Sequence, residues 1–268
     1  MRHLVHVCWI ARRELTARWI LIPVAVILGT LAMLAIRQLD LNRGGADSLL
    51  TGTWIATLGI SVIVGMSLLG DELANGRLSF YFVRPFAPSA IFGGKLLAGV
   101  LLAIGIQGAV IALVAIGLPA IAWVDSDLAA RGLVAVIGER ILATFACVVL
   151  GMAVGIVLQS KTRWFILDVT CLAVVGATTA WVVFRVTHTF YYWHRNRPVQ
   201  LPGYDAHVTI LQIAALAIGV LGLAIATARA LARGRTDRER AHAALSTTLW
   251  PIVVPSAAAM LLVTIAWL

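Results

Sequence analysis

Residues 71–95, DELANGRLSFYFVRPFAPSAIFGGK, separate two long apolar stretches, Thr51–Gly70 and Leu96–Trp123. Crossing a hydrocarbon core of about 30 Å takes roughly 20 apolar residues, so each flanking stretch is long enough to span a membrane. The sequence therefore predicts that 71–95 is a loop between two membrane helices.

The composition agrees with a membrane protein. Hydrophobic residues make up 61% of the 268 residues and charged residues only 12%, whereas a soluble domain carries about 25% charged residues. Several membrane spans leave little of the chain for a separate soluble domain.

The loop has an ordered internal pattern. Gly76 permits a turn that a Cβ would hinder. The segment Arg77–Arg84 has an aromatic centre and a basic residue at each end, and Pro85 and Pro88 stop helices. This order indicates a short aromatic helix that presents an apolar face to a partner. The alternative is a solvated loop with an aromatic patch at the membrane interface.

The pattern resembles the loop after the second span in permease subunits of ABC-2 type ABC transporters. In that family a Glu is followed by a Gly, a short Leu-containing helix, a Pro and Gly-Lys. The matching residues here are Glu72, Gly76, Leu78, Pro85, Gly94 and Lys95. The chain differs from the family in having Arg77 where Thr is usual, and Arg84 before the Pro instead of a basic residue after it.

The resemblance implies that this loop is a coupling helix that sits in a cleft of an ATPase subunit. It assigns ATPase coupling to Glu72, Gly76, Arg77, Leu78, Phe80, Tyr81, Phe82, Arg84 and Pro85.

The fold class predicted from the whole chain is an all-α membrane protein, a polytopic helical bundle. The further predicted spans are Trp19–Ile36, Ile141–Leu158, Trp164–Phe184, Val208–Ala228 and Ser246–Leu268. Residues 1–240 form the six-span core that the resemblance implies, and 241–268 form an additional C-terminal membrane helix, interrupted by two prolines. The alternative for this last segment is an interfacial hairpin. Residues 128–140 fit either a surface helix or the start of the fourth span.

The N-terminal residues 2–18 combine apolar positions at helical spacing with clustered arginines. This pattern predicts an interfacial amphipathic helix that leads into the membrane. The resemblance implies the same, because ABC-2 permeases have an N-terminal helix on the cytoplasmic surface. The alternative is a basic flank that only orients the first span.

The distribution of charge sets the orientation. With the N-terminus inside, inner segments carry 14 Lys and Arg residues and outer loops carry 7. This positive-inside bias places the N-terminus and the 71–95 loop in the cytoplasm. It also accounts for the net charge of +9 without a nucleic-acid partner. The 19 arginines against two lysines fit a bacterial chain, and the expected location is the bacterial cytoplasmic (inner) membrane.

Motifs for catalysis are not apparent. A phosphate loop needs a glycine five positions before Gly94 and a Ser or Thr after Lys95. This chain has Ser89 and Leu96 at those positions, so it does not match the pattern. We therefore expect no enzyme and no cofactor in this chain, with ATP and Mg²⁺ bound by a partner subunit. The histidines show no metal-ligand spacing, and the three cysteines are interpreted as buried free thiols.

Three polar or small-residue features leave two interpretations each. Asp168 is either a functional intramembrane acid or the partner of the nearby basic turn at 159–163. Gly151 and Gly155 serve either packing within the chain or a contact between permeases. The aromatic and basic loop 187–207 is either an interfacial belt or a re-entrant helix that shapes an exit path.

The function that the resemblance implies is a permease subunit, with export as the expected direction. Two copies would form a homodimer, and each would couple to an ABC ATPase subunit. The alternatives are a secondary transporter, or a membrane enzyme or assembly factor that uses the outer loop 187–207. The sequence does not indicate the substrate.

Overall fold

The computed structural model describes residues 2–24, 26–27, 30–31, 46–84, 86–117, 133–159, 166, 168–170, 172–173, 206–234 and 237–265. The regular structure within these ranges is helical and includes no strand. The helices are α1 (Arg2–Arg18), α3 (Ala46–Ala74), α4 (Ser79–Phe82), α5 (Pro88–Gly117), α7 (Leu133–Leu158), α9 (Ala206–Gly234) and α10 (Arg238–Ile265).

Four helices in the described part of the chain are long and apolar enough to cross a membrane. The qualifying segments are Ala56–Ala74 of α3, Pro88–Val110 of α5, Ile141–Leu158 of α7 and Ala217–Gly234 of α9. The chain is therefore an all-α membrane protein, as predicted. The total of six or seven spans stays a prediction, because nearly half of 19–36, most of 164–184 and nearly all of the 187–207 loop lie outside the described residues.

The loop between the second and third predicted spans is shorter than expected. Helix α3 continues to Ala74, and α5 begins at Pro88, eight residues before the predicted start at Leu96. Proline suits the first turn of a helix, where its missing N–H would have no intrahelical partner. The carbonyl of Ala87 accepts the N–H groups of the third and fourth residues of α5, at 2.9 and 3.2 Å. The boundary prediction was wrong because it treated Lys95 as a loop residue.

Two other predicted boundaries also shift. Helix α7 begins at Leu133, so the ambiguous stretch 128–140 is helical from 133 and continuous with the fourth predicted span. Helix α10 runs without a break from Arg238 to Ile265 and contains Pro251 and Pro255. The predicted boundary between the core, 1–240, and the C-terminal helix, 241–268, therefore falls within the first turn of α10. That α10 crosses the membrane stays a prediction.

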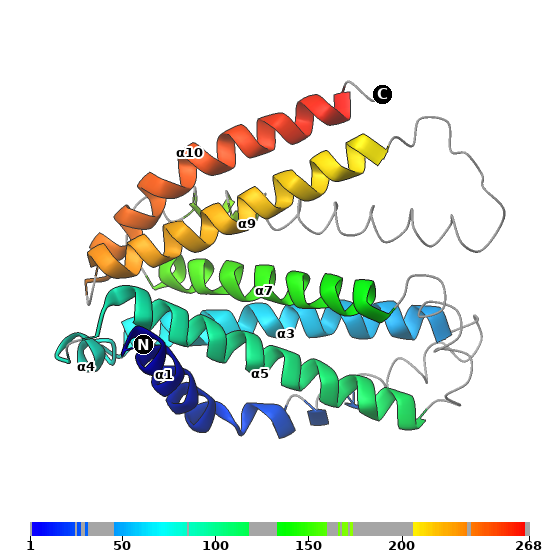
Figure 1. Ribbon diagram of the computed structural model, residues 1–268, viewed down its shortest axis with the longest axis horizontal. Coiled ribbons are helices and arrows are strands. Elements are labelled where there is room, and N and C mark those ends of the chain that lie inside the picture. The colour runs from blue at the N-terminus through cyan, green and yellow to red at the C-terminus, as the bar shows by residue number, and fades with distance from the viewer. Residues whose placement is uncertain are drawn as a thin grey trace. The chain divides into compact units, whose positions relative to one another are not determined.

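The chain divides into two compact units, and the first comprises Met1–Leu69 and Phe80–Met152. In this unit α1 packs against α5 (Figure 1). Its apolar core is formed by side chains from α3 and α5, with further side chains from α1 and the residues that follow it. The core residues are Val64, Leu68, Leu102, Ile106 and Val110, with Leu15, Leu21, Ile22 and Ile60 packed against them.

The second unit comprises Gly70–Ser79 and Ala153–Leu268. Within it α9 and α10 run side by side as an antiparallel pair (Figure 1), and the N–H of Asp237 donates to the carbonyl of Gly234 at 2.8 Å. The Asp237 carboxylate caps α10 by accepting the N–H groups of Glu239 and Arg240, at 3.0 and 3.3 Å. Gly234 closes the turn, since a Cβ there would collide with the backbone of Ala241.

Glycines allow α3 and α7 to approach closely. A Cβ on Gly65 would lie 3.0 Å from the Cα of Gly151, and a Cβ on Gly70 would lie 3.2 Å from the Cα of Gly155. Small residues at such crossings let two backbones pack without intervening side chains. The interpretation of Gly151 and Gly155 as packing within the chain is confirmed.

Candidate functional site

The predicted coupling loop begins with a well-defined helix end. Gly76 has a φ of 66°, the left-handed conformation that glycine adopts without a Cβ clash. The N–H of Arg77 donates to the carbonyl of Glu72 at 2.9 Å. This bond, with a left-handed glycine just before it, is a Schellman motif that ends α3.

An arginine from α10 covers the same helix end. The Arg238 guanidinium donates to the carbonyl of Leu73 at 3.1 Å and also to that of Ala74. These carbonyls lack partners within the helix, and a cation is favourable at a helix C-terminus. Arg238 therefore ties the start of the loop to the start of α10.

The short helix α4, Ser79–Phe82, confirms the aromatic helix predicted between Gly76 and Pro85. The residues of α4 and the residues on either side of it differ in burial. Tyr81 and the preceding Leu78 are buried, whereas Phe80 is 38% exposed and the following Val83 is 86% exposed. The helix therefore has one anchored side and one apolar side that is open in this chain.

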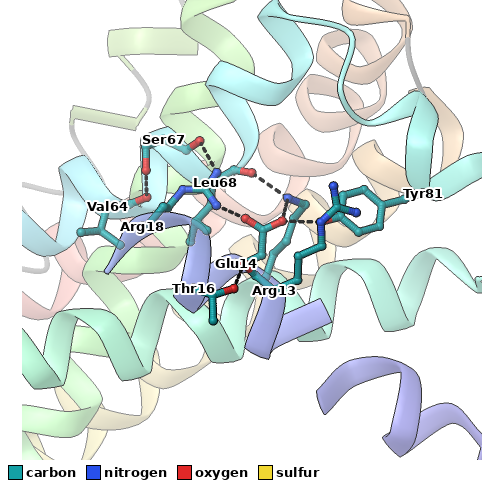
Figure 2. A network of polar contacts seen from close by, with 9 residues as sticks. Arg13, Glu14, Thr16, Arg18, Val64, Ser67, Leu68 and Tyr81 are labelled. Atoms are coloured by element: carbon teal, nitrogen blue, oxygen red, sulfur yellow. Dashed lines mark hydrogen bonds and ion pairs between the residues drawn. The ribbon is translucent and has the colours of Figure 1, made fainter. Parts of the chain in front are cut away.

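The anchor of α4 is the buried carboxylate of Glu14, on the inward face of α1 (Figure 2). The Tyr81 hydroxyl donates to Glu14 Oε1 at 2.5 Å, and the Lys95 ammonium donates to the same oxygen at 2.9 Å. Arg18, one turn after Glu14, pairs with Oε2. One carboxylate thus joins α1, α4 and the start of α5.

The same cluster reaches the end of α3. Lys95 also donates to the carbonyl of Leu68 at 3.2 Å, and Arg18 donates to the carbonyl of Ser67 at 3.4 Å. Lys95 is completely buried and Glu14 nearly so. Buried charges need such partners, because an unpaired charge in an apolar interior is very costly. We call Glu14, Arg18, Tyr81 and Lys95 the Glu14 cluster.

The structure separates the predicted coupling residues into two groups. The buried ones are Glu72, Leu78 and Tyr81. The remaining ones are at least partly accessible: Gly76, Arg77, Phe80, Phe82 and Arg84. Pro85 lies outside the described residues.

Sequence reasoning missed Glu14, Arg18 and Arg238 as supports of this loop, and it assigned Lys95 to the loop itself. One signal was present: Glu14 is the only acidic residue among four arginines in α1, and it lies one turn after the buried Ile10. An acid on the apolar stripe of a basic helix indicates a buried partner.

A second buried polar cluster lies in the other unit. Asp168 pairs with His242 through Oδ2, and its Oδ1 accepts hydrogen bonds from Ser246 and Trp250, both at 3.0 Å. All three donors are on α10. The residues predicted as partners of Asp168, in the turn at 159–163, are outside the described part of the chain except Gln159.

Asp168, His242 and Ser246 do not form a hydrolase triad. In a triad the serine donates to the histidine, whereas Ser246 donates to Asp168. No group of three or more potential metal ligands occurs among the residues that the structure describes.

No relative was found. In comparisons with protein-family models, with curated proteins and with solved structures, nothing matches the chain.

A third polar group holds membrane helices together. Gln107 of α5 donates to Ser61 of α3 at 3.2 Å and to Thr144 of α7 at 2.8 Å, and Thr144 donates back at 3.1 Å. All three side chains are buried. Hydrogen bonds of this kind join membrane helices.

Two of the three cysteines differ from the prediction of buried thiols, and the third, Cys171, lies outside the described residues. Cys8 is exposed on α1, and Cys147 on α7 is half-buried. Cys8 lies on the outer side of α1, because the inward side is taken by Ile10, Ala11 and Glu14.

Proposed function

We propose that the chain is the membrane-spanning permease subunit of an ABC transporter. The proposal includes an export direction, a homodimer of permeases, a cytoplasmic N-terminus and a separate ATPase subunit that binds ATP and Mg²⁺. The observation that carries it is α4, a short helix after a membrane span with a buried anchor on one side and exposed apolar residues on the other.

The anchoring suits a mechanical role. A surface that only bound a partner would need no rigid link to the membrane helices. Here the Tyr81 hydroxyl and the Lys95 ammonium share one oxygen of Glu14, so a displacement of α4 is passed to α1 and α5. At the other end of the loop, Arg238 holds the last turn of α3.

The exposed residues supply the contact for the ATPase. Phe80 and Val83 offer an apolar surface, which matches the way a short helix docks in a groove. Motion of the ATPase subunits on ATP binding would push on this surface and tilt the attached spans.

Co-purification tests the proposal. The tagged chain is solubilised gently, and ATPase subunits that accompany it are identified by their ATP hydrolysis. Val83→Asp places a charge on the exposed side of α4 and is expected to abolish the association. Ala87→Asp is the matched control, because Ala87 is exposed in the same loop but lies five residues after the end of α4, whereas Val83 follows α4 directly.

The result that would contradict the proposal is an absence of any bound ATPase, with no ATP hydrolysis stimulated in candidate partners. Equal loss in the Val83→Asp and Ala87→Asp variants would remove α4 as the contact while leaving an ATPase partner in place.

A secondary transporter is the second candidate, favoured by the buried pair Asp168–His242. Ionisable groups within membrane segments commonly mark ion or proton pathways. Transport by the purified chain in vesicles, driven by a proton gradient without ATP and lost in Asp168→Asn, would favour this candidate over the ABC permease.

A further inference from the structure

Two arginines from distant parts of the sequence stack on the same aromatic rings. The guanidinium carbon of Arg13 lies 4.0 Å from the ring centroid of Phe80, and that of Arg84 lies 4.4 Å from it. Both also lie near the Trp9 ring, at 5.8 and 5.5 Å. The Arg13 guanidinium also lies over the Tyr81 ring, 5.2 Å from its centroid (Figure 2). Both guanidinium groups therefore belong to one aromatic cluster.

The charge of this arginine pair is not balanced within the described part of the chain. Arg13 and Arg84 are exposed, and no described carboxylate forms an ion pair with either. The nearest acid along α1, Glu14, is buried and bound by Lys95, Arg18 and Tyr81. Two unbalanced cations on one aromatic cluster favour the binding of an anion beside them.

The stacking also orients the donors. A guanidinium that lies over a ring uses its face, and its N–H groups remain in the plane of the group. The N–H groups of each arginine stay available for the oxygens of a phosphate, which arginine binds through paired hydrogen bonds.

The surroundings are apolar and lie at the end of a membrane span. Arg84 precedes Pro88, the first residue of α5, by four positions. Leu4 and Val5 of α1 are exposed, and Phe86 packs against Trp9 with 5.5 Å between centroids. Tryptophan and arginine with exposed aliphatic residues are typical of the headgroup region of a bilayer.

We propose that Arg13 and Arg84 together bind the phosphate of an anionic phospholipid headgroup. The aromatic rings of Trp9 and Phe80 hold the two guanidinium groups in place, and the exposed aliphatic residues of α1 contact the glycerol and the acyl chains. Phe80 also belongs to the surface proposed for the ATPase, but lipid binding is measured on the chain alone, so its failure can be told apart from failure of the proposed function.

Native mass spectrometry of the full chain in detergent tests the site, with phosphatidylglycerol as the probe. Arg13→Ala/Arg84→Ala is expected to bind phosphatidylglycerol about tenfold more weakly than the wild type, because charge-assisted hydrogen bonds are lost. Arg2→Ala/Arg12→Ala is the matched control, since it removes the same charge from exposed positions of α1 without touching the stack. It is expected to bind as the wild type does.

A second variant protects the test against misfolding. Arg13→Lys/Arg84→Lys keeps both charges but removes the planar forks, and it is expected to bind with intermediate affinity. Phosphatidylcholine and inorganic phosphate serve as competitors, and neither is expected to displace phosphatidylglycerol at equal concentration.

Three results would overturn the proposal. The first is unchanged phosphatidylglycerol binding in both the Ala and the Lys double variants. The second is an equal loss in the control. The third is displacement by inorganic phosphate alone, which would make the pair a site for a soluble anion.

Discussion

The ammonium of Lys95 lies 2.9 Å from the carboxylate of Glu14, 81 residues earlier in the chain, and both side chains are buried. This pair joins α1 to α5 within the first unit, just beyond the end of the loop. Removing one member of a buried ion pair typically costs about 3–5 kcal/mol of stability, whereas a surface ion pair contributes about 0–1 kcal/mol.

We expect Lys95→Met to lower the free energy of unfolding by about 3–5 kcal/mol, because the buried carboxylate loses one of its two cations. The measurement is denaturant unfolding in detergent micelles. In the double variant Glu14→Gln/Lys95→Met the loss should be smaller than the sum of the two single losses. Additive losses would show that the two groups do not interact.

Tyr81→Phe is expected to cost about 1.5–3 kcal/mol, the contribution of a hydrogen bond to a charged group. The ring is kept, so the loss reports the hydroxyl bond to Glu14. The check is thermal unfolding, with Phe82→Tyr as a control that changes a hydroxyl at a half-buried position of the same helix. A Tyr81→Phe variant as stable as the wild type would refute α4 anchoring through this bond.

Gly65→Ala is expected to destabilise the chain by about 1–3 kcal/mol, since the added methyl group meets the backbone of α7 and the core is already packed. Gly59→Ala is the control in the same helix, where no atom lies within 4 Å of the added carbon. There we expect a gain of about 0.5–1 kcal/mol from helix propensity. The free energies of unfolding are measured by denaturant titration. The same change in Gly65→Ala as in Gly59→Ala would contradict the close α3–α7 crossing.

Gly76→Ala is expected to cost about 1–2 kcal/mol, because an L-residue is strained at a φ of 66°. Gly76→Asn should cost less, since asparagine tolerates this conformation better. The comparison is made by thermal unfolding. A larger loss for Asn than for Ala would show that space, and not backbone conformation, sets the requirement.

Arg238→Ala is expected to open the end of α3 locally. The carbonyls of Leu73 and Ala74 lose their donor, so amide exchange in residues 71–79 should become faster. Arg240→Ala is the control, because Arg240 is exposed and its ion pair with Asp237 is a surface pair. Unchanged exchange in Arg238→Ala would remove the link between α10 and the loop.

The apolar spans, the N-terminal helix and the glycine turn could be predicted from sequence because each depends on a local property. Whether an apolar run can cross a membrane depends on its length, which the sequence gives directly. Residues 2–18 were expected as a helix from their spacing, and α1 covers the same residues. Gly76 was expected at a turn, and it has a positive φ.

The start of α5 could not be predicted in this way. A hydropathy argument assigns a lysine to solvent, and this moved the expected boundary to Leu96. In the folded chain Lys95 is buried because Glu14 and the carbonyl of Leu68 satisfy its charge. The cost of burying a charge depends on partners that the local sequence does not contain.

The sequence by itself determined that the chain is a helical membrane protein with a short aromatic helix after one span. Only the tertiary structure decided which polar residues support that helix. Glu14 meets Lys95 across 81 residues, and Arg238 reaches Leu73 across 165. Apolar length acts along the chain, whereas a buried charge is stabilised by groups that the fold brings to it from far away in the sequence.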